Sequence, residues 1–107
     1  MKNKRKWNRK NYFANKKNSD KRRNNGHPVY VYGGRRNYRK YLLFTHTPEE
    51  GKEDNFEKLN YNIDPNDKMD CYVKKTYEIA EEKSLLIPKV KYRIHDSDKE
   101  KIKKYKK

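Results

Sequence analysis

The sequence predicts a mainly β (α+β) domain of five or six short strands that closes as a small β-barrel and ends in a short helix. Three observations predict this class. Short runs of β-branched and aromatic residues recur between residues 29 and 94, and turn signals separate them. The last ten residues match a helix start. The chain has 107 residues, enough for one domain, and closing a barrel removes exposed strand edges.

A hairpin is the first predicted element. Residues 29–32 alternate Val and Tyr, which is typical of a strand with side chains on both faces. Residues 33–37 begin with two glycines, which supply the positive φ that a tight turn needs. Residues 38–45 form the return strand around an apolar centre.

The later strands are predicted to be shorter. Residues 47–54 form a polar loop and residues 64–67 a turn. Strands are expected at 56–63, 71–79, 85–87 and 90–94, the last of them with an apolar face that alternates with basic residues.

The chain end carries a helix signature. Ser97 is followed three residues later by Glu100, the spacing of a capping box, and lysines fill the last turn. Only Ile102 and Tyr105 form an apolar side, so weak docking is expected.

Charge divides the chain into three parts. Residues 1–26 hold eleven Lys and Arg against one acid and few apolar residues, so a disordered basic arm is predicted. Residues 27–96 form the barrel domain, and residues 97–107 a Lys-rich helix. Within the arm, Trp7, Tyr12 and Phe13 are open to two interpretations: a first strand or tether on the domain, or aromatic rings that stack on bases.

Composition excludes several classes of protein. Apolar runs are too short for a membrane span, and no secretory signal is recognisable. Cys71 is the single cysteine, so neither a disulfide framework nor a zinc site is expected, and no cofactor is predicted. The expected location is cytoplasmic.

A net charge of +15, concentrated in particular segments, predicts contact with a polyanion, and nucleic acid is favoured over membrane. Cations neutralise phosphates while aromatic rings stack on bases. The expected binding residues are Arg22 and Arg23 of the arm and, in the hairpin, Tyr30, Tyr32, Arg35, Arg36, Tyr38, Arg39, Lys40 and Tyr41. We expect the hairpin valines to fill the barrel and Tyr30 and Tyr32 to line its outer surface. The alternative places these tyrosines at the core edge.

Between His27 and Leu86 the order of motifs resembles the MazF/PemK toxin family. The block at 27–32 is similar to that family's Arg-Pro opening, although His27 replaces the Arg. Leu43-Phe44-Thr45 is similar to its strand ending in Thr, and residues 70–73 and 79–85 are similar to a later stretch. The resemblance implies an SH3-like barrel, a homodimer, an antitoxin partner and metal-independent cleavage of single-stranded RNA.

Under this resemblance His27 takes the acid/base position and Thr45 bonds the scissile phosphate. His titrates near neutral pH, which suits acid/base chemistry. His46 is a second candidate base, although a strand would turn it to the opposite face. Arg35, Arg36 or Arg39 would supply the charge that stabilises the transition state.

Three functions stay open at this point. The first is a MazF-like endoribonuclease. The second is a non-enzymatic module that binds RNA or DNA, with RNA favoured. The third is an inhibitor or adaptor that docks a protein partner of a nucleic-acid-processing machine. In the alternative without catalysis, His27, Thr45 and His46 are ordinary surface residues.

Overall fold

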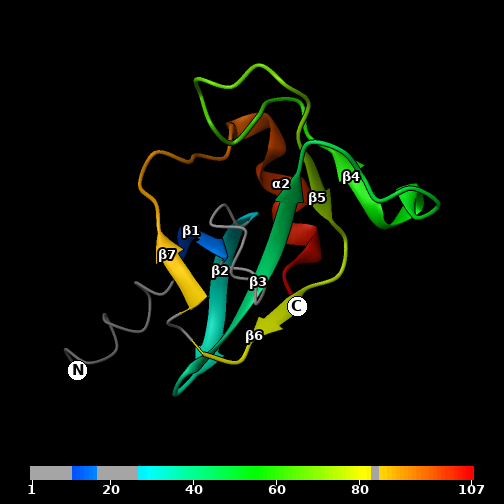
Figure 1. The fold of residues 1–107 in the computed structure, drawn as a ribbon. Helices are drawn as coiled ribbons and strands as arrows, with labels where there is room; N and C mark the ends of the chain where they lie inside the picture. The colour runs from blue at the N-terminus through cyan, green and yellow to red at the C-terminus, as the bar shows by residue number, and fades with distance from the viewer. Residues whose placement is uncertain (1–10, 17–26, 83–84) are drawn as a thin grey trace, which may run out of the picture.

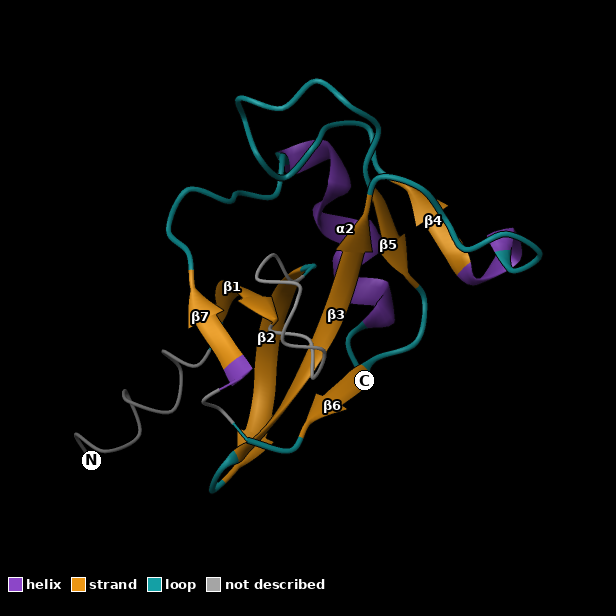
Figure 2. Cartoon of the chain, viewed as in Figure 1, coloured by secondary structure: helices purple, strands orange, loops and turns teal. Residues whose placement is uncertain are grey.

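In the computed structural model, residues 11–16, 27–82 and 85–107 are described. They form one mainly antiparallel sheet of seven strands with a short C-terminal helix (Figures 1 and 2), which confirms the mainly β class. The strands are β1 (Tyr12–Lys16), β2 (Pro28–Arg35), β3 (Tyr38–Thr45), β4 (Phe56–Lys58), β5 (Tyr72–Lys74), β6 (Glu78–Ala80) and β7 (Leu86–Pro88); the helices are η1 (Glu53–Asn55), η3 (Asp96–Asp98) and α2 (Lys99–Tyr105).

The β2–β3 hairpin is the centre of the sheet. Its strands pair from Val29 with Leu43 up to Arg35 with Tyr38, and the register shifts between Val31 and Gly33. Such a bulge increases the local twist. The tight turn lies at Arg36 and Asn37, where Arg36 has a φ of 51°; Gly33 and Gly34, expected in the turn, lie in β2, where Gly34 has a φ of 141°.

The segment before the hairpin contributes a strand. β1 lies between β2 and β7 in the sheet, pairing Phe13 with Tyr30 and Ala14 with Pro88. Ala14 is fully buried. The prediction of a disordered arm over residues 1–26 is therefore wrong for residues 12–16, where the alternative of a first strand is confirmed. Trp7, Arg22 and Arg23 lie outside the described residues.

The sheet path runs β4-β5-β3-β2-β1-β7, with β6 also paired to β3. β6 pairs with the first half of β3, at Arg39–Tyr41, and β5 pairs with the end of β3, at Phe44 and Thr45. Among the described residues, no pairing joins β7 to β4 or β6. Figure 1 shows β7 and β6 on opposite sides of the central hairpin.

Three predicted strands differ from the observed chain. The strand expected over 71–79 forms two separate strands, β5 and β6, which pair with different parts of β3. The strand expected over 56–63 stops at Lys58, because residues 59–71 form a long loop that Asn and Asp side chains hold through bonds to nearby backbone. The strand expected over 90–94 is not formed: Val90 is 91% exposed, while Tyr92 and Ile94 pack against the core from extended coil.

Both faces of the hairpin are covered. Alternate side chains on one face, Val29, Val31 and Tyr41, join Ala14, Ala80 and Leu86 in one cluster. The other face presents Leu42 and Phe44 to a second cluster that includes Ile102 of α2. Figure 1 shows α2 beside β3 and β5, consistent with this cluster. The helix expected to dock weakly thus closes the main core.

One buried carboxylate connects α2 to the long loop. Asp98 has no exposed surface and accepts hydrogen bonds from the backbone N–H of Asn60 at 2.9 Å and of Tyr61 at 3.1 Å. Lys101 Nζ lies 3.5 Å away. A carboxylate bonded in this way satisfies two backbone donors that would otherwise be orphaned. Within the described part of the chain, no helix is long and apolar enough to cross a membrane.

Candidate nucleic-acid interface and histidine pocket

Lysines and aromatic rings gather where the end of α2 meets the hairpin. We call this the α2–hairpin patch: Tyr32, Lys40, Tyr77, Lys106 and Lys107. Lys40 Nζ lies 4.6 Å from the Tyr77 ring centroid and 5.9 Å from that of Tyr32, and Lys106 Nζ lies 5.9 Å from the Tyr32 centroid. Cation–π contacts of this kind hold ammonium groups over aromatic faces. Residues distant in sequence thus form one basic, aromatic surface.

Hydrogen bonds join the two halves of the patch. Lys40 Nζ donates to the Lys107 carbonyl at 2.8 Å, and the Lys107 N–H donates to the Tyr32 hydroxyl at 3.2 Å. Burial raises the pKa of Tyr32, although the Lys107 N–H bond works to lower it. Tyr32 is therefore a neutral phenol at physiological pH, suited to stacking.

The patch cations lack carboxylate partners within the described residues. Several lysines elsewhere are paired with carboxylates, such as Lys74 with Glu78 at 2.6 Å and Lys91 with Asp64 at 3.2 Å. In the same part of the chain, Lys40, Lys106 and Lys107 contact rings, backbone and the Tyr32 hydroxyl. Their charge stays available to an external anion.

The predicted side-chain directions of β2 are confirmed for the valines and wrong for the tyrosines. Val29 and Val31 are buried as expected. Tyr30 and Tyr32 do not line an open outer surface, since they pack half-buried against the α2-side core and stack on each other at 6.4 Å. This matches the alternative in which the tyrosines lie at the core edge. The reason is that α2 covers the tyrosine face of the hairpin, which the sequence pattern had assigned to solvent.

Two expected binding residues are buried. Tyr41 is 2% exposed and its hydroxyl donates to Glu78 at 2.8 Å, so its ring has no face free for a base. Arg39 is 8% exposed, and its guanidinium donates to the carbonyls of Arg36 and Tyr38. Arg39 thus holds the hairpin turn and does not reach a phosphate. Arg35, Arg36 and Tyr38 are exposed at the turn.

The three expected catalytic residues line one small cavity, the histidine pocket. It has a volume of about 230 Å³, and its walls include His27, Thr45, His46, Asn62 and Asp67. Continuing the hairpin register by two residues past Val29 and Leu43 sets His27 opposite Thr45, both on the face of the buried valines.

His46 points to the other face, as expected, and is already bonded. Its Nε2 lies 3.3 Å from Asp67 Oδ2, and its Nδ1 lies 3.2 Å from the Asp70 carbonyl oxygen. The Thr45 hydroxyl donates to the Thr47 carbonyl at 3.1 Å. His27 is exposed, and its ring makes no hydrogen bond within the described part of the chain. It is the titratable side chain best placed to meet a substrate.

The predicted cationic support for catalysis is not in the pocket. Arg35, Arg36 and Arg39 lie at the turn, whereas His27 and Thr45 lie at the open end of the same hairpin. Strands rise about 3.3 Å per residue, so roughly 20–27 Å separates them. The expectation that these arginines stabilise a phosphorane at Thr45 is therefore wrong for a single chain.

No group of three or more His, Cys, Asp or Glu side chains in residues 11–16, 27–82 and 85–107 is placed to hold a metal ion. Cys71 is buried, and burial raises the pKa of its thiol to about 11. Cys71 is therefore a thiol that packs in the core at neutral pH, as its position in a strand-like segment suggested.

Comparisons with protein-family models, curated proteins and solved structures found no match for this chain.

The sequence pattern does not reveal several contributors to these sites. Tyr77, Lys106 and Lys107 complete the α2–hairpin patch, and only the Lys-rich chain end pointed to the latter two. Asp67 anchors His46, whereas its sequence context indicates only a turn. No local signal links any of these residues to the hairpin, because the contacts span more than 20 residues.

Proposed function

We propose that this protein binds single-stranded RNA through the α2–hairpin patch. The observation that carries the proposal is the set of lysines that lie over aromatic rings without carboxylate partners among the described residues. Such a surface binds a strand by neutralising its phosphates.

The distribution of charge supports the same partner. The described residues carry 19 Lys and Arg against 14 Asp and Glu, and the remaining residues carry 11 against one. Acids such as Asp64, Asp70, Glu78 and Asp96 are paired with lysines outside the patch, and no Asp or Glu side chain of the described residues pairs with the patch lysines. Electrostatic attraction of this kind concentrates a polyanion at the surface.

Fluorescence anisotropy with a labelled single-stranded RNA, measured over a range of salt concentrations, tests the proposal. The slope of log K against log salt falls by about 0.7 for each phosphate of a single strand that the protein no longer neutralises. The double variant Lys40→Ala/Lys106→Ala should therefore flatten the slope by about one to one and a half units.

The control removes equal charge elsewhere. Lys75→Ala/Lys89→Ala lowers the net charge by two at positions outside the patch, and the slope should then change by less than about half a unit. Equal effects of the two double variants would overturn the patch as the site that holds the strand. A strand of the same sequence in DNA tests the preference for RNA.

A second candidate function, metal-independent cleavage of that RNA, is favoured by the histidine pocket. His27 and Thr45 lie opposite each other and line the same cavity. His27 would act as general base or acid, with the Asp67-anchored His46 beside it. The described walls of the pocket include no Lys or Arg, so a cation must come from elsewhere to stabilise the phosphorane.

Incubating labelled RNA with the protein in EDTA tests cleavage. An endoribonuclease should cut the RNA and lose most activity in His27→Ala, while Lys75→Ala, which lies outside this pocket, should keep it. Intact RNA under conditions where anisotropy shows binding would instead identify a non-enzymatic binding module.

A further inference from the structure

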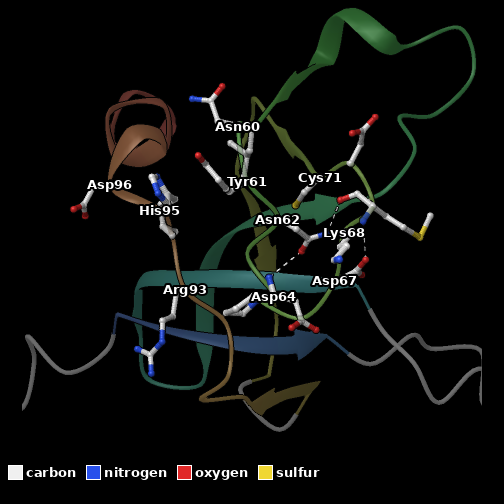
Figure 3. Close-up of a pocket in the computed structure, with 15 residues that line it drawn as sticks. Asn60, Tyr61, Asn62, Asp64, Asp67, Lys68, Cys71, Arg93, His95 and Asp96 are labelled. Atoms are coloured by element: carbon white, nitrogen blue, oxygen red, sulfur yellow. Dashed lines mark hydrogen bonds between the residues drawn. The ribbon is translucent and has the colours of Figure 1, made fainter.

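A cavity with a volume of about 620 Å³ lies between the loop 59–71 and residues 93–96 (Figure 3). Neither the α2–hairpin patch nor the histidine pocket accounts for it. Its walls carry an exposed aromatic pair, an exposed thioether and several amides. The size is in the range of sites that hold small organic ligands.

Tyr61 and His95 form a flat platform in this cavity. Their rings stack with centroids 3.9 Å apart and planes 19° apart. Tyr61 nevertheless stays 55% exposed, so the ring face away from His95 is open. Figure 3 shows the two side chains together at one side of the cavity, facing Asn62 and Cys71 across it. An open aromatic face beside a cavity is suited to a second planar ring.

Hydrogen bonds to the Tyr61 backbone and to the His95 ring hold the platform in place. The Tyr61 N–H donates to the buried Asp98 carboxylate. The Ser97 N–H donates to His95 Nδ1 at 3.1 Å, so this nitrogen carries a lone pair and the neutral ring holds its proton on Nε2. Both rings are thus positioned before any ligand arrives, which lowers the entropy cost of binding.

Each carboxylate around the cavity has a partner. Asp64 pairs with Lys91, Asp70 with Lys58 and Asp96 with Lys99, and Asp67 Oδ2 lies 3.3 Å from His46 Nε2. Lys68 also lines the cavity, and it has no carboxylate partner within the described residues. An anionic ligand in this cavity would therefore face carboxylates that already have partners, and the Lys68 ammonium group would be available to bind it.

We propose that this cavity binds an unpaired nucleobase, which stacks on the open face of Tyr61 while its phosphate approaches Lys68. The base belongs either to a free nucleotide or to a single strand, and the strand form rests on the RNA binding proposed above. The cavity shares Asn62, Asp64, Asp67 and Cys71 with the histidine pocket. A strand with one base on Tyr61 can therefore extend toward His27.

The strand form is tested with the full-length protein and two labelled oligonucleotides of equal length, one of uridines and one abasic. Stacking of a base on an aromatic ring is worth at least a several-fold change in affinity. Wild-type protein should bind the uridine strand at least about fivefold more tightly than the abasic strand. Tyr61→Ala and Tyr61→Leu should both remove this preference, and Tyr61→Phe should keep it.

Tyr72→Ala is the matched control, because Tyr72 is a partly exposed tyrosine of β5 that lines neither the cavity nor the histidine pocket. It should leave the preference for bases unchanged. The Leu variant keeps apolar bulk without a π face, so it separates stacking from simple packing. Unfolding midpoints of all variants show whether each one is folded.

The free form is tested by NMR titration of AMP against ribose 5-phosphate. AMP should shift the Tyr61 and His95 ring signals of wild-type protein but not the remaining ring of Tyr61→Ala, and ribose 5-phosphate should shift neither. Binding of AMP without binding of any strand would support the cavity and overturn the proposed RNA function. Equal affinity for uridine and abasic strands, with no AMP response, would overturn the cavity while a patch-dependent salt slope still supported RNA binding.

Discussion

Asp98 is the residue on which the position of Tyr61 most depends. Its carboxylate is fully buried and accepts the N–H groups of Asn60 and Tyr61, so it fixes the loop against α2. Neither donor has water as an alternative partner once the loop is closed. A single acidic side chain in a Lys-rich segment thereby fixes one wall of the 620 Å³ cavity.

Replacing this residue gives a direct stability test. Asp98→Ala leaves two backbone N–H groups unpaired in the interior, and should lower the free energy of unfolding by about 2–4 kcal/mol. Asp96→Ala removes a neighbouring carboxylate whose pair with Lys99 is exposed, and should cost less than about 1 kcal/mol. Denaturant unfolding measures both, and equal losses would contradict the bracing role of Asp98.

Glu78 makes stability depend on pH. Burial works to raise its pKa, but hydrogen bonds from Lys74 and Tyr41 and the Lys74 charge prevail, so the pKa lies below the ordinary 4.5. A carboxyl with a lowered folded-state pKa stabilises the fold above its unfolded value, and this contribution is lost as pH falls through the folded value.

The unfolding midpoint should therefore stay level above about pH 5 and decline as the pH falls below about 4.5. Glu78→Gln should make that decline shallower, while Glu50→Gln removes one carboxylate from an exposed loop and controls for net charge. A decline with the same steepness in Glu78→Gln and wild type would rule out this role.

At the scale of elements, the hairpin shows how local sequence specifies structure. Gly33 and Gly34 predict the turn, and alternation of Val and Tyr predicts two faces. The hairpin and its two faces are confirmed, because side-chain direction follows from local alternation, but the tight turn lies at Arg36 and Asn37, and both glycines lie in β2 and pair with β3.

Gly34 offers a measurable test of that hairpin. A Cβ at this position would lie 2.3 Å from the Tyr38 carbonyl oxygen, in a backbone with φ of 141°. Gly34→Ala should therefore lower the free energy of unfolding by about 3 kcal/mol or more. Gly51 also has a positive φ but nothing within 4 Å of such a Cβ, so Gly51→Ala should cost only about 1–2 kcal/mol. Similar losses in thermal unfolding would contradict the steric explanation.

Other elements could not be predicted from their own residues. Residues 90–94 alternate like a strand, yet no neighbouring strand of the described chain is available there, and the segment is held by the Arg93 N–H to Ile63 and by Tyr92 in the core. Residues 12–16 look like part of a basic arm, yet β2 and β7 both pair with them. Strand formation depends on a partner, and the partner is distant in sequence.

At the scale of the whole molecule, charge and fold are unevenly distributed. The ten N-terminal residues hold six Lys and Arg and no acid, while β1 begins only at Tyr12. Because β1 is an inner strand of the sheet, an electrostatic test must remove residues 1–10 and leave residues 11–26 in place.

That deletion should reduce the slope of log K against log salt for single-stranded RNA, by up to about four units if all six cations contact phosphates. The unfolding midpoint should stay close to that of the full chain, since the deletion removes no described strand. An unchanged slope would show that residues 1–10 make no phosphate contact in the complex.

The sequence by itself determined the mainly β class, the central hairpin, the C-terminal helix and the basic character that points to a polyanion. Each of these follows from local periodicity, turn chemistry or composition. Only the tertiary structure decided that Arg39 and Tyr41 are buried, that Lys106 and Lys107 meet Tyr32, and that Tyr61 stacks on His95. The physical reason is that a strand has two faces of known composition, while packing between distant segments decides which face is covered and which stays open.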